Sequence, residues 1–274
     1  RADGTAVYMT QDIGTAIDRY KDYPGLNGMV YTVGNEQDYH FKVLFLILKK
    51  LGYAWADNCY HLSYGMVDLP TGKMKSREGT VVDADDIMAE MKTTAEQLAR
   101  DAGKLENIPE EDRESLFKDV GYGALKYFLL KVDPKKSMMF DPAASIDFIG
   151  NTGPYIQFNY VRARSVLRNA GIEDVASLLP ISPVHLDDTE RSLLMSALSL
   201  PGIIEEAAHS YDPSLVANLC YDITKSYSSW YQNHPILNEE DDQVRTARLA
   251  LCALSSSAVK IGMSLLGVSM PEKM

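Results

Sequence analysis

The sequence has few cysteines, a shortage of positive charge and no long apolar run. Its 274 residues include 3 cysteines, an odd number whose spacing suits neither a disulfide framework nor a zinc cluster. We therefore expect a cytoplasmic protein from a reducing compartment, without a protein-bound metal. The 38 acidic residues outnumber the 27 basic ones, for a net charge of −11. That balance argues against a broad grip on DNA or RNA, although it permits a local basic site.

Several familiar motifs are also missing. No apolar run approaches the roughly 18 residues of a membrane span and no secretory leader is visible, so we expect no membrane partner. The chain contains no Walker-type glycine loop, no G-x-G-x-x-G motif and no evident Ser/His/Asp or Cys/His constellation. It has no starting Met, and we expect it to be part of a longer protein.

The first 70 residues alternate strand-like and helix-like segments. A helix is expected after Thr10 or Asp12, either of which could cap it, and another is expected to stop at Gly52. This order predicts a parallel sheet with crossover helices. The strand-like segments are residues 5–9, 28–33 and 60–67, and the helical ones are residues 12–23 and 36–52.

From residue 83 onward the pattern is almost entirely helical. The change of character near residues 145–152 predicts an α/β part over residues 1–147 and an all-α part over residues 148–274. The expected helices cover residues 83–106, 109–131, 153–171, 186–199, 200–210, 213–232 and 240–267.

Two polar pairs stand where strands are expected to give way to helices. Ligands of open α/β sheets bind beyond the carboxyl ends of the strands. Asp12, four residues after Tyr8, could receive a cation there, or could simply complement a helix dipole. Gln37 and His40 share one helical face and could bond a ligand, although a histidine at a helix start is more often structural.

A third candidate is the basic loop GKMKSREGTVV, residues 72–82. Lys73, Lys75 and Arg77 lie within five positions, bracketed by glycines. Such side chains suit a phosphate that gathers charge in a transition state. The alternative is an ordinary solvated basic hairpin.

Together these stretches resemble the arginyl-tRNA synthetases, a family of class I synthetases. The loop resembles the Lys-Met-Ser-Lys-Ser signature, but Ser76 stands where the second lysine normally does. Lys75, Arg77 or a lysine outside this sequence could take its place. YMTQDIGTAIDRY resembles the family's Tyr-x-x-x-Asp element, and FIGNTGPYIQFNYVRARSVLRNAG resembles the start of its anticodon-binding domain. The resemblance runs nearly from end to end.

The resemblance implies the C-terminal part of a Rossmann-like catalytic domain followed by a helical-bundle anticodon-binding domain. It implies ligation of arginine to tRNA through arginyl-adenylate, with ATP and Mg²⁺ as substrate and no DNA partner. The implied site residues are Tyr8, Asp12 and Gln37 for arginine; His40, Gly65, Met66 and Val67 for ATP; Lys73, Lys75 and Arg77 for catalysis at the pyrophosphate; and Arg162, Tyr227, Tyr231 and Met274 for tRNA.

Two features qualify this interpretation. The first class I signature, of His-Ile-Gly-His type, is absent, so we expect this chain to be inactive alone, and we expect a monomer. The aromatic residues of segment 213–232 could stack on RNA bases or, at helical spacing, could form core. The rival hypothesis is a non-catalytic tRNA-binding or regulatory relative that keeps the fold.

Overall fold

The computed structural model describes residues 3–70, 83–101, 103 and 108–274. The chain divides into two compact units. The first comprises Arg1–Val67 with Pro134–Met138, and the second comprises Asp68–Asp133 with Met139–Met274. Each is described by itself below.

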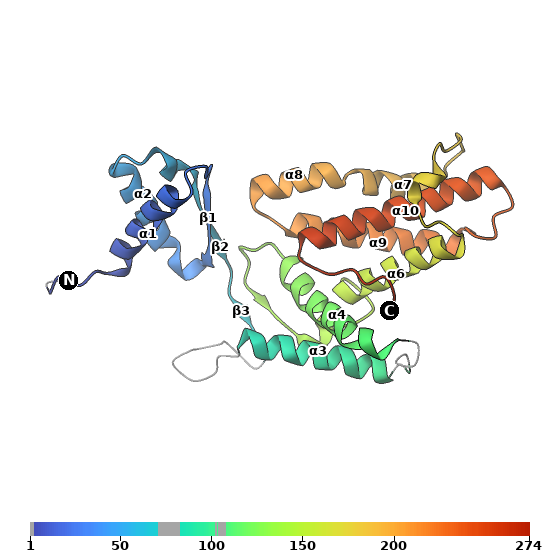
Figure 1. The fold of residues 1–274 in the computed structure, drawn as a ribbon, viewed down its shortest axis with the longest axis horizontal. Helices are drawn as coiled ribbons and strands as arrows, with labels where there is room; N and C mark the ends of the chain where they lie inside the picture. The colour runs from blue at the N-terminus through green and yellow to red at the C-terminus, as the bar shows by residue number, and fades with distance from the viewer. Residues whose placement is uncertain (1–2, 71–82, 102, 104–107) are drawn as a thin grey trace. The chain divides into compact units, whose positions relative to one another are not determined.

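The first unit is an α/β unit with a parallel pair of strands (Figure 1). β1 and β2 pair in parallel, with Met29 opposite Cys59 and Gly34 opposite Tyr64. The predicted parallel pairing and the helix between the strands are thus confirmed. The elements are α1 (Tyr8–Asp22), β1 (Met29–Gly34), η1 (Asn35–Gln37), α2 (Asp38–Lys50), η2 (Ala54–Asn58) and β2 (Cys59–Tyr64).

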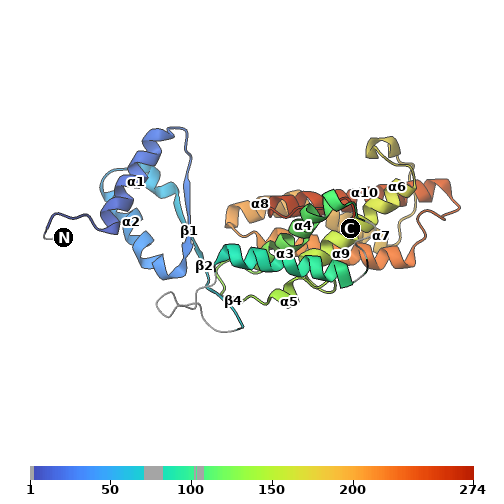
Figure 2. The same cartoon turned by 60° about the horizontal axis from the view of Figure 1, so that its bottom comes forward.

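One face of the strand pair carries the small core of this unit. Alternate residues of β1, namely Met29, Tyr31 and Val33, pack against Leu44 and Leu48 of α2. Figures 1 and 2 show α1 and α2 on the same side of the strands. The alternation of β1 is what directs one set of side chains toward these helices.

The strand expected over residues 5–9 is wrong, because α1 already begins at Tyr8. The Val7 carbonyl accepts hydrogen bonds from the amides of Thr10 and Gln11, at 2.9 and 3.2 Å, so the first turn closes there. Neither Thr10 nor Asp12 is therefore the N-cap. The helical spacing of the apolar residues of α1 overrides the strand-like composition of its first turn.

The second unit is a helical assembly in which α10 is central (Figures 1 and 2). α10 packs on α6, α7 and α9, α4 packs on α3 and α6, and α8 packs on α9. All the long helices predicted in this region are present. They are α3 (Ala84–Asp101), α4 (Glu110–Leu130), α6 (Gly153–Asn169), α7 (Asp188–Leu198), α8 (Leu200–Ser210), α9 (Ser214–Asn233) and α10 (Asp242–Leu265), with short α5 (Pro142–Ser145) and η5 (Val175–Leu178).

By length and composition alone, α10 could cross a membrane. Leu249, Cys252, Val259 and Met263 of this helix are nevertheless buried within the second unit. Its hydropathy is therefore accounted for by its central place in a protein core.

The run GNTGPYIQ, residues 150–157, forms the N-cap and the first turn of α6. Thr152 caps the helix by accepting a hydrogen bond from the Tyr155 amide at 3.2 Å. Gln157 is fully buried, and its Nε2 donates to the carbonyls of Asp119 and Ser269, at 2.9 and 2.8 Å. A buried amide with these partners ties α6 to α4 and to the C-terminal tail.

Two short strands occur where the chain passes between the units. β3 (Val67–Asp68) pairs with β4 (Met138–Met139). Compactness thus assigns α3 and α4 to the second unit, whereas the sequence pattern placed a boundary between residues 147 and 148. The division by sequence stays a prediction, since it rests on the change from strand-like to helical pattern and not on packing.

Candidate active site

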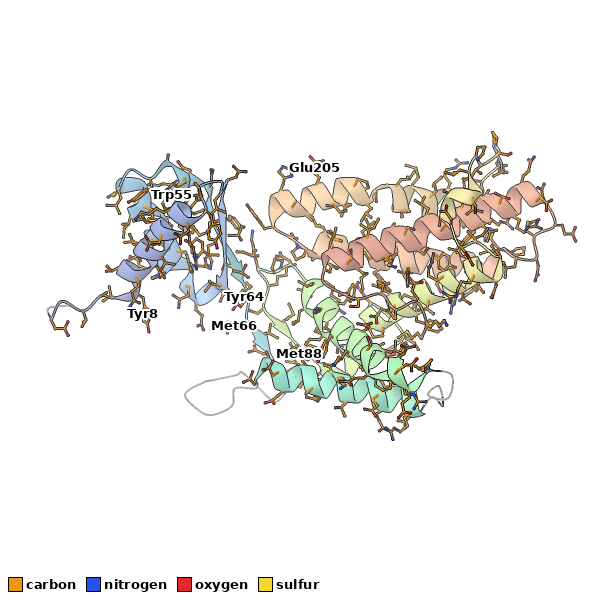
Figure 3. The ribbon with its side chains drawn as sticks, in the orientation of Figure 1. Tyr8, Trp55, Tyr64, Met66, Met88 and Glu205 are labelled. Atoms are coloured by element: carbon orange, nitrogen blue, oxygen red, sulfur yellow. The ribbon has the colours of Figure 1, made fainter. Side chains whose placement is uncertain are left out.

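The first turn of α1 places Tyr8 and Asp12 four residues apart on one helical face. Tyr8 is 83% exposed, and Figure 3 labels it at the beginning of the helix. The Asp12 side chain is 44% exposed. A phenol and a carboxylate therefore stand on the surface of this helix with room for a ligand.

The beginning of α2 supplies the second pair. Gln37 ends η1 and is the N-cap residue of α2, but its side chain makes no capping hydrogen bond. His40 lies in the first turn of α2, and its Nε2 is 2.6 Å from Oδ2 of Asp12. The structure thus brings Asp12 and His40 together across 28 residues of sequence.

An aromatic cluster packs against His40 through Phe41, whose ring centroid is 5.5 Å away. Burial raises the pKa of Tyr31 to about 12, so its phenol is neutral at pH 7. Its ring packs against Phe41 and Phe45, with centroids 5.0 and 5.6 Å away. The Arg19 guanidinium lies 5.9 Å from the Tyr31 ring centroid, so a cation as well as the Asp12 carboxylate borders this cluster.

Tyr64 is a residue that the sequence analysis missed. It ends β2 opposite Gly34, and it is 42% exposed. A Cβ built on Gly34 would lie 3.6 Å from the Tyr64 ring and 3.9 Å from Sδ of Met66. Figure 3 labels both side chains at the carboxyl end of β2. The signal that could have found Tyr64 is an aromatic residue at the carboxyl end of a strand, facing a glycine.

The backbone around Gly65 is already engaged. The Gly65 amide donates to the Pro134 carbonyl at 2.7 Å, and the Met138 amide donates to the Met66 carbonyl at 3.0 Å. A methyl group on Gly65 would overlap the Lys136 carbonyl, so only glycine fits. The Gly65 amide and the Met66 carbonyl were both predicted to border ATP. In the structure they hold the segment after β2 against residues 134–138.

Lys73, Lys75 and Arg77 lie outside the described residues.

In the second unit, Arg162 and Tyr231 lie together. The Arg162 guanidinium is 5.4 Å from the Tyr231 ring centroid and 4.9 Å from that of Phe158. Beside Tyr231 is a cavity of about 470 Å³ that is lined by polar side chains as well as apolar ones. It is lined by Val166, Tyr231, Gln232, Asn233, His234, Pro235, Ile236, Leu237 and Asn238. A half-buried ring, a cation and amide groups are a combination that can receive an unstacked nucleobase.

Tyr227 is placed differently from this pair. It is 3% exposed, and its hydroxyl lies 3.4 Å from the Cys252 sulfur inside the core. Trp230 is 1% exposed. The alternative that aromatic residues at helical spacing form core thus applies to both, and Tyr227 is not available to stack on RNA here.

Met274 and the tail before it lie on the second unit. Met274 lines an apolar cavity of about 380 Å³ with Phe117, Phe148 and Phe158. Glu272 accepts a hydrogen bond from Arg164 Nε at 3.1 Å. The position of Met274 is therefore set within the protein's own apolar side chains.

One cluster of possible metal ligands occurs in the described part of the chain. Asp187, Glu190 and His234 place one ligand atom each within 4.8 Å of one another. His234 Nε2 is 2.7 Å from Oδ2 of Asp187, and Arg248 Nε donates to Glu190 at 2.9 Å. A guanidinium already neutralises the buried Glu190, so the cluster does not fit a cation site.

Comparison with protein families covers most of the chain. Residues 1–141 match the family described as tRNA synthetases class I (R), catalytic domain. Residues 156–274 match the DALR anticodon binding domain.

Curated relatives match the chain over its full length. The arginine–tRNA ligase of Flavobacterium psychrophilum is 55% identical, and that of Porphyromonas gingivalis strain W83 is 50% identical. Each alignment covers 100% of this chain but only 45% and 46%, respectively, of the relative. The chain thus spans about half the length of the proteins it matches.

Solved structures of arginyl-tRNA synthetases also align with the whole chain. The arginyl-tRNA synthetase of Thermus thermophilus aligns with a TM-score of 0.84 at 26% identity, over 100% of this chain and 50% of that one. The arginyl-tRNA synthetase of Plasmodium falciparum aligns with a TM-score of 0.80 at 24% identity, over 100% and 46%, and supports the fold.

Proposed function

The chain belongs to the arginyl-tRNA synthetase family of class I synthetases, and on that premise we propose that the whole protein attaches arginine to its tRNA. The arginine carboxylate attacks the α-phosphate of ATP, which gives arginyl-adenylate and releases pyrophosphate. The 3′-terminal ribose hydroxyl of the tRNA then takes the arginyl group and AMP leaves. Such chemistry depends on position and charge and needs no protein nucleophile.

The arginine site is assigned to Tyr8, Asp12 and Gln37. A guanidinium needs an ionised carboxylate with free lone pairs, and Asp12 offers one that is half-exposed. The exposed Tyr8 phenol and the side-chain amide of Gln37, which makes no capping hydrogen bond, would complete the site. The observation that carries the proposal is the half-exposed Asp12 carboxylate, which lies where α1 contacts α2.

The ATP site is assigned to the carboxyl ends of β1 and β2. Met66 and Val67 would border the adenosine, with Gly65 fixing the segment and Tyr64 offering a ring. Mg²⁺ would arrive with the phosphates as part of the substrate.

The leaving pyrophosphate is assigned to Lys73, Lys75 and Arg77. Lys75, Arg77 or a lysine outside this sequence would stand in for the missing second signature lysine. Cations held where charge develops lower the barrier to phosphoryl chemistry.

The tRNA site is assigned to the second unit. Tyr231, with Arg162 over its ring, would receive an unpaired base. Met274, the last residue of the tail, would be a second contact with the tRNA. A ring and a guanidinium suit single-stranded RNA, because every base has a face to stack.

The test is a crossed pair of variants in the full-length enzyme, assayed by aminoacylation. Asp12→Asn should raise the arginine KM by about 100-fold, since it removes the charge that meets the guanidinium, and leave tRNA affinity unchanged. Tyr231→Ala should weaken tRNA binding at fixed salt by about tenfold and leave the arginine KM unchanged. Unchanged arginine kinetics in Asp12→Asn would sink the pocket.

The second candidate is a non-catalytic tRNA-binding relative. It would bind tRNA without charging it, and it has no reason to keep an arginine pocket beside a signature loop. Arginine-dependent charging of tRNA by the wild-type enzyme separates the two hypotheses.

We further propose that the protein is a cytoplasmic monomer without DNA or membrane partners. Sedimentation checks the oligomeric state, and cell fractionation checks the location.

A further inference from the structure

Within the described part of the chain, the hydrogen-bond partner of the Asp12 carboxylate is His40. Nε2 of His40 is 2.6 Å from Oδ2 of Asp12, within hydrogen-bonding distance. The contact joins α1 and α2 through two residues that are 28 positions apart in sequence.

The exposure of the two side chains is unequal. The His40 side chain is 23% exposed and the Asp12 side chain is 44% exposed. The imidazole therefore approaches Asp12 from the protein side, packed edge-on to Phe41 with centroids 5.5 Å apart. Oδ1 of Asp12 has no hydrogen-bond partner within the described part of the chain, and it is left for a second donor.

We propose that His40 is a positioning residue for the arginine pocket, which holds the Asp12 carboxylate so that its remaining lone pairs meet the substrate guanidinium. The inference rests on the proposed function. With a proton on Nε2, the imidazole donates to Oδ2, fixes the rotamer of Asp12 and leaves the other carboxylate oxygen to the substrate. Ordering the carboxylate before binding lowers the cost of binding. The sequence had assigned His40 to ATP.

Two variants of the full-length enzyme separate this role from mere packing. His40→Gln and His40→Asn both remove the ring that packs on Phe41. The longer glutamine places an amide donor near the position of Nε2, whereas asparagine reaches only the position of Nδ1. His209→Asn is the matched control, because His209 is exposed on α8 and bonds a carbonyl of its own helix at 2.8 Å.

Aminoacylation is measured with arginine and ATP varied in turn. We expect His40→Asn to raise the arginine KM by about tenfold, His40→Gln to restore it to within about threefold, and the ATP KM to stay within about twofold. In the Asp12→Asn background, His40→Asn should change the arginine KM by less than about twofold, because the positioned group is gone.

An ATP KM that moves as much as the arginine KM, or an arginine KM that His40→Asn leaves unchanged, would overturn the inference while the proposed function stands. A wild-type enzyme that does not charge tRNA with arginine would overturn both.

Discussion

The two units of the molecule use their aromatic side chains in opposite ways. In the first unit, Tyr8, Tyr23 and Tyr39 are 83%, 65% and 80% exposed. In the described part of the second unit no aromatic ring exceeds the 39% of Tyr211, and Trp230 and Tyr227 are buried. The first unit thus leaves several large aromatic side chains exposed, whereas the second buries most of its aromatic side chains at least in part.

The cores differ in the same sense. The core of the first unit is a small cluster from α1, α2 and η2 against one face of two strands. That of the second is continuous through α4, α6, α7, α8, α9 and α10. A larger buried cluster gives more stability per residue, so the two units should respond unequally to matched substitutions.

The largest expected effect comes from the two tryptophans, one in each unit. Trp230 is 1% exposed, and its truncation to alanine should cost the second unit about 3–5 kcal/mol of unfolding free energy. Trp55 is half-buried, with its ring stacked on Tyr20 at 4.1 Å, and Trp55→Ala should cost about 1–2 kcal/mol. Urea denaturation followed by far-UV circular dichroism measures both.

The remaining tryptophan of each variant reports on the other unit. In Trp230→Ala, the fluorescence transition of Trp55 should stay where it is in the wild type. A shift of that transition by the same free energy would mean that the units unfold as one, and would break the comparison.

A smaller effect is expected where α3 and α4 cross. A Cβ on Gly121 would lie 2.6 Å from the Met91 carbonyl oxygen, and backbone cannot yield as a side chain can. Gly121→Ala should destabilise the second unit by about 1–3 kcal/mol through overpacking. Gly202 on α8 has open space around a Cβ, so Gly202→Ala should stabilise by up to about 1 kcal/mol. Thermal unfolding that moves in the same direction for both variants would contradict this.

The parts of the fold that could be predicted are those specified by local chemistry. Apolar spacing and terminal residues such as Pro109 gave α2, α4 and α6–α10 close to their observed ends, because periodicity and end signals lie within a few residues of each other. The first turn of α1 was misjudged, since Val7 and Tyr8 have strand-like composition but α1 buries Met9, Ile13 and Ala16 at helical spacing.

The site was predictable in residue type but not in pairing. Asp12 and His40 were assigned to different ligands, because nothing in 28 intervening residues says that their side chains meet. Tyr227 and Tyr231 are four residues apart on α9, so their positions in sequence do not distinguish them. Tyr227 is nevertheless buried, with its hydroxyl against Cys252 of α10. Such choices are made by elements far away in sequence.

The smallest expected effect concerns the tail of the second unit, held by Glu272. Its carboxylate accepts from Tyr160 at 2.6 Å, Lys260 at 2.9 Å and Arg164 at 3.1 Å. Partial burial alone would raise the pKa of Glu272, but these three hydrogen bonds together lower it to about 2. Because the pKa is lower in the folded state, the stabilisation is complete above the ordinary pKa of 4.5 and is lost as the pH falls toward 2.

Glu272→Gln should therefore cost stability at neutral pH, and less as the solution becomes acidic. Glu272 is 46% exposed, and solvent screening limits the cost to about 1 kcal/mol. Urea denaturation of both proteins from about pH 7 to about pH 3 should show the difference shrinking below about pH 4.5, with exposed Glu240→Gln as the control. A difference that stays constant with pH would mean that the carboxylate's charge contributes nothing. The tail would then be held by uncharged contacts such as the hydrogen bond from Gln157 Nε2 to the Ser269 carbonyl.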